Sequence, residues 1–593
     1  MIVLRVSERR PVDTPRMWEG GEVSRVRFLI AVVASSGRRW SKMAALLVAW
    51  SGSTALPAHG QTPAAPAAGK AAPAAKPSRA TILRGEYGAL RANNDLLYYH
   101  LDIRVDPKEQ ALGGTNTIRF RMLKDDSKIQ LDLNPSLSVD KIVFRDVALK
   151  FEREFSAVFV TFPETLKEGQ VYSIDFHYSG KPASTGRFGG ISFRKDPAGR
   201  PWIYTSCEMQ GASVWWPCKD QWRDEVESMD LSVTIPKELV DASNGRLVGK
   251  KDLGDGTTRW DWHVSYPINS YCVSLNIGQY EHFADSLGDL TLDFYVLPEN
   301  LEKAKKQFAQ AKGMLEAFQH YFGEYPFKKD GYKLIEVPYA GMEHQSAVTY
   351  GNRYANGYLE RDWTGVGIST RFDFIIVHES GHEWFGNSIS AADRSDMWIH
   401  EGWTTYLEVL YVEFMYGRAD ALKYVNAYKA RVRNASRIIG NRGENVSPPG
   451  DQYFKGALFL NTLRSVVDDD TRWWALLRGL HERFKHKNIM TEDLVEYFNR
   501  ETGKDLTPVF DQYLRHAAIP VLELKFDEAK VSYRWKADEK AFAMPVRVGS
   551  KDNWQVIHPT TEWQTTTTAL KKDEFEVATD LYYIGVSKKS SEG

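Results

Sequence analysis

The chain has 593 residues, of which 43% are hydrophobic and 26% charged, and its formal net charge at pH 7 is −1. A single hydrophobic core stops growing near about 250–300 residues, so this length predicts several domains. The first 60 residues hold nine Lys/Arg and four Asp/Glu, so the remainder carries a formal charge of −6 and lacks the basic footprint of a nucleic-acid-binding protein.

The first 80 residues are predicted to lie outside the folded body. A basic segment (38–42) precedes a short apolar stretch (43–50), and small residues follow it. This is the layout of a secretory signal peptide, so residues 1–60 are expected to be a signal peptide or N-terminal extension of an exported, periplasmic or secreted protein. A disordered extension is the alternative. Residues 61–80, rich in Pro and Ala, are expected to be a linker, and no apolar run is long enough to span a membrane as a helix.

Residues 81–285 are predicted to form a mostly antiparallel β domain. Segments such as "YYHLDIRV" and "TNTIRFRM" alternate apolar and polar residues, and turn residues recur between them. The three cysteines, Cys207, Cys218 and Cys272, are expected to form no structural disulfide, because a folded part of this size does not need one.

Residues 286–516 are predicted to be mainly helical. From Pro298 to Phe322, apolar residues recur in steps of three and four, which indicates one helix face. A second helix is expected from near Met397, capped by Asp396, to Gly417. Residues 517–593 return to strand patterns and predict a small C-terminal β sandwich.

A five-residue motif in the helical region predicts a metal site. In "HESGH" (378–382), His378 and His382 lie one turn apart on one helix face, so their imidazoles can share a metal ion. Glu379 is placed to reach a water on that ion. After a further eighteen residues stands Glu401, in "WIHEGWTTY". Two histidines and one carboxylate leave a position open for water, which is the usual make-up of a catalytic zinc site.

This ligand pattern resembles the gluzincin aminopeptidases, peptidase family M1. "SCEMQGASVWWPCKD" (206–220) resembles the stretch that sends an acidic or amide side chain from the N-terminal domain into the family's site, here Glu208. The resemblance covers residues from about 85 to 516. It implies an α+β multidomain protein whose catalytic domain is thermolysin-like and mainly helical.

Two further stretches match the family in the same order. "AGMEHQSA" resembles its substrate-binding strand and supplies Gly341, Met342 and Glu343, with His344 where many members have asparagine. "YFKG" resembles its tyrosine motif and supplies Tyr453. Many members also carry a long helical C-terminal domain over the site. This chain has room only for the small β domain, which implies a more open site.

The resemblance implies a zinc-dependent aminopeptidase with one zinc ion per chain, held by His378, His382 and Glu401. The zinc would activate a water molecule and polarise the scissile carbonyl. Glu379 would take the water's proton and pass it to the leaving amine. Tyr453 would donate a hydrogen bond to the oxyanion of the transition state.

The implied substrates are peptides with a free N-terminus. Glu208 and Glu343 would hold the substrate's α-ammonium, and Gly341 and Met342 would line the binding strand. Of the residues near the ligands, Glu408 is a candidate to support a metal ligand. His400 fits either such a role or a surface position. The sequence sets no oligomeric state.

Two other functions stay open on the sequence alone. The leukotriene-hydrolase branch of the family hydrolyses epoxides, which implies an aspartate and a second tyrosine shortly before Tyr453. Here Asn445 and Pro448 stand eight and five positions before it. A non-catalytic peptide-binding protein on the same fold is the other alternative, although every expected catalytic residue is present.

Overall fold

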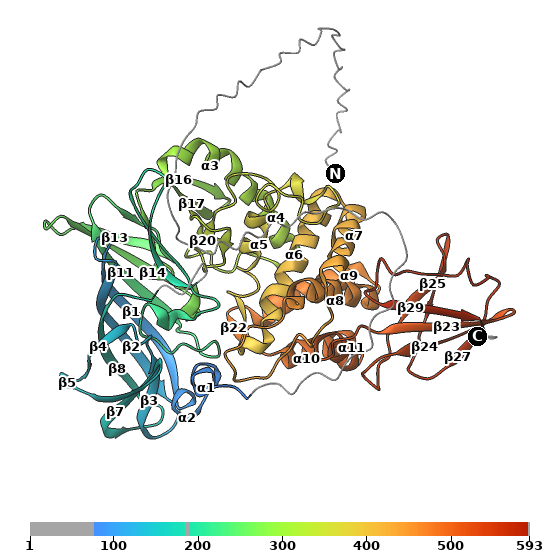
Figure 1. The fold of residues 1–593 in the computed structure, drawn as a ribbon, viewed down its shortest axis with the longest axis horizontal. Helices are drawn as coiled ribbons and strands as arrows, with labels where there is room; N and C mark the ends of the chain where they lie inside the picture. Colours follow the sequence, from blue (N-terminus) through green and yellow to red (C-terminus); the bar gives the residue numbers. More distant parts are fainter. Residues whose placement is uncertain (1–75, 184–188, 591–593) are drawn as a thin grey trace, which may run out of the picture. The chain divides into compact units, whose positions relative to one another are not determined.

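The computed structural model describes residues 76–183 and 189–590. The predicted signal segment (1–60) and most of the predicted linker (61–80) therefore lie outside the described residues. Within the described residues, a β region, a helical region and a second β region follow one another along the chain (Figure 1). No helix of these residues is both long and apolar enough to cross a membrane. All three cysteines are buried and unpaired.

The N-terminal region is built on an eight-stranded sheet, as its alternating pattern predicts. Neighbouring strands run antiparallel except for β1 and β11, which run parallel. In β1 the alternation buries Tyr99, Leu101, Ile103 and Val105 on one face. In sheet order the strands are β13 (Arg246–Asp252), β14 (Thr257–Val264), β11 (Ser228–Pro236), β1 (Asn94–Asp106), β2 (Ala111–Met122), β8 (Val171–Gly180), β4 (Leu137–Phe144) and β5 (Val147–Ala148).

Two smaller sheets complete this region. One contains β3 (Asp126–Asp132), β7 (Ala157–Leu166) and β6 (Lys150–Glu154). The other contains β12 (Val240–Asp241), β15 (Asn276–Gly278), β10 (Pro201–Ser206) and β9 (Gly190–Lys195). The structure adds two short helices at the start of this mostly β region, α1 (Arg79–Gly85) and α2 (Ala89–Ala92). Helices of one or two turns are too short to show a 3.6-residue period in the sequence.

The metal-motif helix packs near a five-stranded sheet whose first strand begins inside the predicted N-terminal domain. The order is β16 (Glu281–Leu287), β17 (Leu290–Val296), β18 (Tyr332–Glu336), β20 (Val348–Tyr350) and β19 (Gly341–Met342). The predicted boundary at residue 285 therefore falls inside β16. A strand pattern shows that a segment is extended, but it does not show which sheet the segment joins.

Helices make up most of the region from residue 301 to residue 514. The stretch predicted as one helix is divided at Ala309 into α3 (Leu301–Phe308) and α4 (Gln310–Phe322). The others are α5 (Phe374–Gly381), α6 (Trp398–Tyr416), α7 (Arg418–Ala427), α8 (Asp451–Val467), α9 (Asp470–Phe484), α10 (Thr491–Thr502) and α11 (Thr507–Leu514).

Helix α6 ends before Gly417, as predicted, but its start is set differently. Asp396 does not cap the helix. Its carboxylate instead accepts hydrogen bonds from Thr491 at the start of α10 and from Arg442. The aspartate thus joins three segments that are distant in sequence, a role that local capping rules do not reveal.

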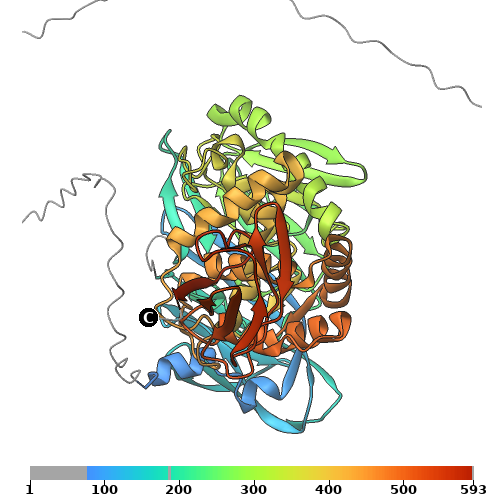
Figure 2. The same cartoon turned by 90° about the vertical axis from the view of Figure 1, so that its right-hand side faces the viewer.

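The C-terminal region consists of two sheets, as the strand pattern predicts. The first has the order β27 (Gln564–Thr567), β24 (Lys530–Lys536), β23 (Val521–Asp527) and β29 (Gly585–Ser590). The second has β26 (Asn553–Ile557), β25 (Val546–Ser550) and β28 (Glu576–Val577). Figure 2 shows these strands facing the viewer. They contact the helical region at points such as the hydroxyl of Tyr513, which donates to the carbonyl of Tyr583.

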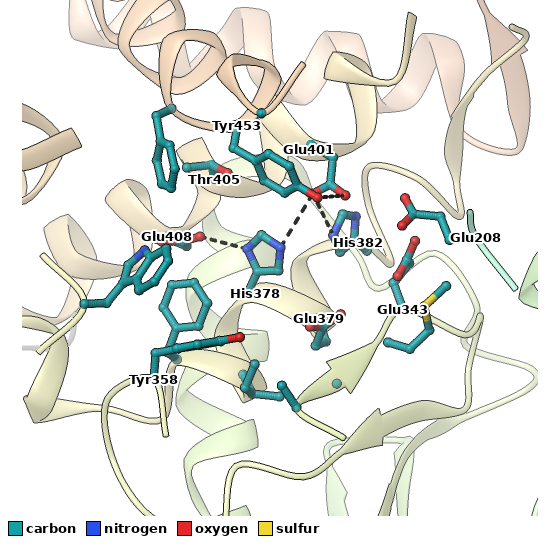
Figure 3. A pocket seen from close by; sticks show the side chains of 18 of the residues that line it. Glu208, Glu343, Tyr358, His378, Glu379, His382, Glu401, Thr405, Glu408 and Tyr453 are labelled. Carbon is teal, nitrogen blue, oxygen red and sulfur yellow. Dashed lines mark hydrogen bonds and ion pairs between the residues drawn. The ribbon is translucent and has the colours of Figure 1, made fainter. Parts of the chain in front are cut away.

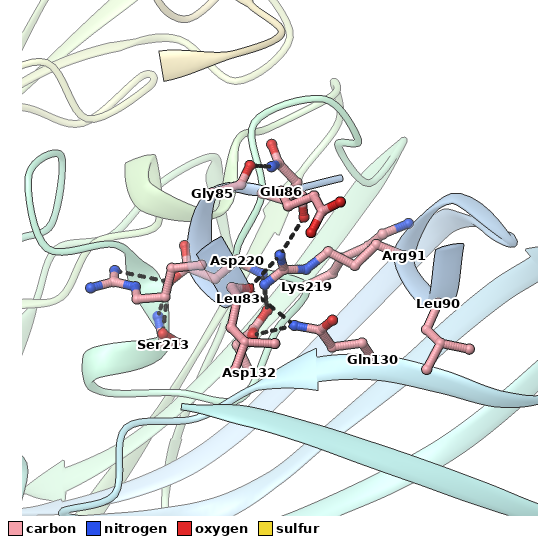
Figure 4. A network of polar contacts seen from close by, with 12 residues as sticks. Leu83, Gly85, Glu86, Leu90, Arg91, Gln130, Asp132, Ser213, Lys219 and Asp220 are labelled. Atoms are coloured by element: carbon pink, nitrogen blue, oxygen red, sulfur yellow. Dashed lines mark hydrogen bonds and ion pairs between the residues drawn. The ribbon is translucent and has the colours of Figure 1, made fainter. Parts of the chain in front are cut away.

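A buried polar network orders the segment that follows β10 (Figure 4). The Arg91 guanidinium lies 2.6 Å from the Asp132 carboxylate, and both side chains are buried. The Asp132 carboxylate also accepts the backbone N–H of Asp220. Asp220 in turn accepts the hydroxyl and the N–H of Ser213. Because buried charges are tolerated when paired and hydrogen-bonded, this network fixes the turn that follows Glu208.

Candidate active site

Helices α5 and α6 bring the three predicted metal ligands together (Figure 3). His378 and His382 lie one turn apart at the end of α5, and Glu401 lies in the first turn of α6. The Nε2 atoms of the two histidines are 3.6 and 3.5 Å from the same oxygen, Oε2 of Glu401. Donor atoms around one tetrahedral zinc ion are separated by roughly 3.3 Å, given Zn–N and Zn–O bonds of about 2.0 Å.

Hydrogen bonds on the far side of each imidazole set its orientation. Nδ1–H of His378 donates to Oε1 of Glu408 over 2.8 Å, and Nδ1 of His382 donates to the carbonyl of Phe385 over 3.0 Å. In its neutral form, each ring then presents the lone pair of Nε2 toward Glu401. Such supporting contacts fix the tautomer of metal-binding histidines.

The donor set fits a cation. Oε2 of Glu401 is buried and has no hydrogen-bond partner among the described residues. Burial alone would lower the pKa of His378, but the carboxylates of Glu401 and Glu408 raise it well above its ordinary value. Without a metal, a proton on His378 therefore offsets the converging negative charge. A zinc ion would replace that proton, so metal binding at this site releases it.

Glu379 lies against the edge strand β19. Its side chain is 8% exposed, and a Cβ atom on Gly341 would stand 2.6 Å from its Cγ. Only glycine at position 341 allows this close approach. Burial and the charges of Glu343 and Glu401 raise the pKa of Glu379 to about 8, although His378 lowers it. A bound cation would lower the pKa of Glu379.

Tyr453 reaches the site from the first turn of α8. Its hydroxyl donates to Oε1 of Glu401 over 2.9 Å. Helices α6 and α8 approach closely because Gly402 of one faces Gly456 of the other. A Cβ atom added to Gly402 would stand 3.2 Å from Cα of Gly456. Burial and the charge of Glu401 raise the pKa of Tyr453 well above its usual value, so the phenol keeps its proton.

Glu208 and Glu343 converge beside the metal donors. Figure 3 shows both carboxyl groups on the same side of the histidine pair. Donor atoms of Glu343, Glu379 and His382 all lie within 4.8 Å of one another. Oε1 of Glu208 is buried without a hydrogen-bond partner among the described residues. Burial and the charge of Glu343 raise the pKa of Glu208, and burial and the charge of Glu401 raise that of Glu343 to about 7.

All nine predicted site residues line a single cavity of about 500 Å³. The lining also includes four aromatic residues, Tyr358, Trp363, Phe374 and Phe454. Figure 3 shows Tyr358 across the histidine pair from Glu208 and Glu343. Ring centroids of neighbouring members are 5.0–6.1 Å apart. A mostly apolar cavity with a few convergent polar groups is typical of a small-ligand site.

Three residues of the site emerge clearly only in the structure. Glu408 was a candidate, and it binds His378 while accepting a hydrogen bond from Tyr424. His400 is fully buried, which excludes the surface position, and burial lowers its pKa to about 3. Tyr271 was not predicted. It comes from the N-terminal domain, so no spacing along the chain links it to the metal motif.

Comparison with known proteins agrees with this arrangement. Residues 96–272 match the sequence model of the peptidase M1 N-terminal domain, and residues 306–513 match that of the peptidase family M1 domain. A probable aminopeptidase 2 of Sulfurisphaera tokodaii is 23% identical over 430 residues, or 69% of this chain and 52% of the relative. Endoplasmic reticulum aminopeptidase 1 of Homo sapiens is 25% identical over 350 residues, or 56% of this chain and 36% of the relative. The chain thus spans about half the length, or less, of these relatives.

Solved structures show the same fold. An M1 zinc metallopeptidase from Deinococcus radiodurans is 21% identical with a TM-score of 0.61, over 74% of this chain and 98% of that chain. A mutant of that protein is bound to a Tyr-Ser-Ala substrate. Family models match both the N-terminal β domain and the helical domain that holds the metal motif, in the expected order. The chain therefore belongs to peptidase family M1.

Proposed function

We propose that this chain is a zinc aminopeptidase that hydrolyses the first peptide bond of peptides with a free N-terminus. The observation that carries the proposal is the pair of carboxylates, Glu208 and Glu343, beside a three-donor metal site. Relatives named as aminopeptidases support the same reading. We also propose one zinc ion per chain and, from the layout of residues 1–60, export from the cytoplasm.

The chain's own residues divide the reaction among them. His378, His382 and Glu401 would hold the zinc, which when bound supplies an activated water and polarises the scissile carbonyl. Glu379 accepts the proton of the attacking water and passes it to the leaving amine. Tyr453, kept protonated by its surroundings, donates a hydrogen bond to the oxyanion that forms in the transition state.

The two acids set the position of the substrate. An α-ammonium between Glu208 and Glu343 makes charge-assisted hydrogen bonds and relieves the repulsion of two nearby carboxylates. An ammonium held there places the first peptide bond near the metal donors, because donor atoms of Glu343 and His382 lie within 4.8 Å of each other. The four aromatic residues of the cavity lining, Tyr358, Trp363, Phe374 and Phe454, offer apolar surface to the rest of the substrate.

The proposal is tested by following an unlabelled tripeptide and a decapeptide with the zinc-loaded protein by mass spectrometry. We expect successive loss of single N-terminal residues, abolished by a chelator and restored by zinc. Internal fragments as first products would contradict aminopeptidase activity. Intact peptides with zinc bound would favour the non-catalytic alternative.

Glu401→Ala should lose the metal. The substitution removes one of three donors, and the remaining histidine pair holds zinc much more weakly. We expect zinc content, measured by atomic absorption after dialysis against a mild chelator, to fall from about one ion per chain towards zero. Full retention of zinc by this variant would show that Glu401 is not a ligand.

Tyr453→Phe should slow turnover while leaving zinc and substrate binding nearly unchanged. Removing one oxyanion donor lowers kcat by roughly 10²–10³-fold. KM should move little, because the contact strengthens only in the transition state. Steady-state kinetics on a single amino-acid anilide separates the two parameters, and a rise in KM with kcat intact would contradict this role.

A further inference from the structure

A hydrogen-bonded chain connects the anchor Glu343 to the N-terminal domain. Tyr271 lies in the 3₁₀ turn η2 (Ser270–Cys272), and its hydroxyl donates to Oε1 of Glu343 over 3.2 Å. The same hydroxyl lies 3.4 Å from Nδ1 of His400. Nε2 of His400 accepts the backbone N–H of Ala391 over 2.8 Å. The side chains of Glu343, Tyr271 and His400 are all buried.

The chemistry of these groups allows only one donor-to-acceptor direction for this series of hydrogen bonds. A backbone N–H is always a donor, so Nε2 of His400 must be the acceptor. A neutral imidazole with an accepting Nε2 carries its proton on Nδ1. That proton points to the oxygen of Tyr271, so the single hydroxyl hydrogen of Tyr271 is left for Glu343. A doubly protonated His400 would place two donors against each other at Ala391.

Aromatic packing holds the rings of Tyr271 and His400 in place. The ring of Trp222 stacks on His400 at 4.9 Å and 10°, and on Tyr271 at 5.2 Å and 29°. The guanidinium of Arg394 lies 5.1 Å from the Trp222 ring. Arg394 also donates to the backbone carbonyls of Met209 and Glu208. The stack therefore supports the backbone at Glu208 and the ring of Tyr271, whose hydroxyl contacts Glu343.

We infer that Ala391, His400 and Tyr271 form a positioning device that aims the Glu343 carboxylate at the substrate's α-ammonium. The inference rests on the proposed aminopeptidase function. Within the described residues, Tyr271 is the only side chain that donates a hydrogen bond to that carboxylate. It holds Oε1 and leaves Oε2 for the substrate. Long hydrogen bonds in a free active site commonly tighten when the substrate binds.

Tyr271→Phe is the direct test, because it removes the hydroxyl and keeps the ring. Loss of a hydrogen bond to a charged group is expected to raise KM for a free-amine peptide by about 10-fold or more, with kcat changed less than about 3-fold. The dissociation constant of the same peptide, measured by calorimetry in a Glu379→Gln background, should rise equally. Zinc content should stay the same. Tyr497→Phe is the matched control, since it removes a buried hydroxyl that donates to the carbonyl of Leu476 in another part of the domain.

Two substitutions of His400 separate positioning from simple support of the fold. The amide nitrogen of His400→Asn stands near the place of Nδ1 and can donate to Tyr271, but the contact with Ala391 is lost. His400→Gln can accept from Ala391 but leaves Tyr271 without its donor. We expect the asparagine variant to melt at the lower temperature yet bind the free-amine peptide more tightly than the glutamine variant.

The inference is overturned if the glutamine variant binds as tightly as the asparagine variant, or if Tyr271→Phe behaves as Tyr497→Phe does. Both failures are distinct from failure of the proposed function, in which the wild-type protein with bound zinc would neither cleave nor bind the free-amine peptide.

Discussion

Glu379→Gln is expected to retain zinc and lose nearly all peptide hydrolysis. The amide occupies the volume of the carboxylate, but its nitrogen cannot accept a proton from the attacking water. Proton transfer by a positioned side chain contributes about 10²–10⁴-fold to the rate, and we expect a loss near the upper end because Glu379 would serve both the water and the leaving amine. The measurement is kcat on an amino-acid anilide.

Two controls make that result specific. Zinc content should match the wild type, because Glu379 is not one of the three donors, which are Nε2 of His378, Nε2 of His382 and Oε2 of Glu401. Binding of a free-amine peptide by calorimetry should also persist, since Glu208 and Glu343 are unchanged. A zinc-loaded variant that turns over at the wild-type rate would show that another group takes the proton.

Blocking the substrate's amino group is expected to cause the second large loss. N-acetylation removes the positive charge and leaves Glu208 and Glu343 facing each other without a cation. Each hydrogen bond to a charged group contributes about 1.5–3 kcal/mol. Losing two of them should lower kcat/KM by roughly 10²–10⁴-fold. The comparison is between a tripeptide and its acetylated twin, with a C-terminally amidated twin as the matched control.

Glu343→Ala should reproduce much of this loss on the free peptide. The variant should keep its zinc, because the carboxylate of Glu343 is outside the donor set of His378, His382 and Glu401. Its preference for the free peptide over the acetylated one should shrink, since one of the two anchors is gone. Equal cleavage of free and acetylated peptides by the wild-type protein would assign both acids to another role.

The sequence by itself determined the parts of this protein that are encoded locally. His378 and His382 share one helix turn, so the i, i+4 spacing alone places their rings on one face. Alternation in the segment of β1 predicted a strand with one buried face, because successive residues of a strand point to opposite faces. Glu401 followed from the need of a catalytic zinc for a third donor, whereas Glu343, Glu208 and Tyr453 were identified only through their resemblance to family motifs.

Tertiary structure alone decided how those pieces meet. The contact between Gly402 and Gly456 brings Tyr453 to Glu401, and it joins two helices some fifty residues apart in sequence. Tyr271 reaches Glu343 from another domain, across a separation that no periodicity records. Contacts between distant segments also decide where elements begin. Asp396 was predicted as a local helix cap, but it instead binds Thr491 and Arg442. Local patterns reflect the preferences of one segment, whereas these contacts depend on the burial and pairing of polar groups from several segments.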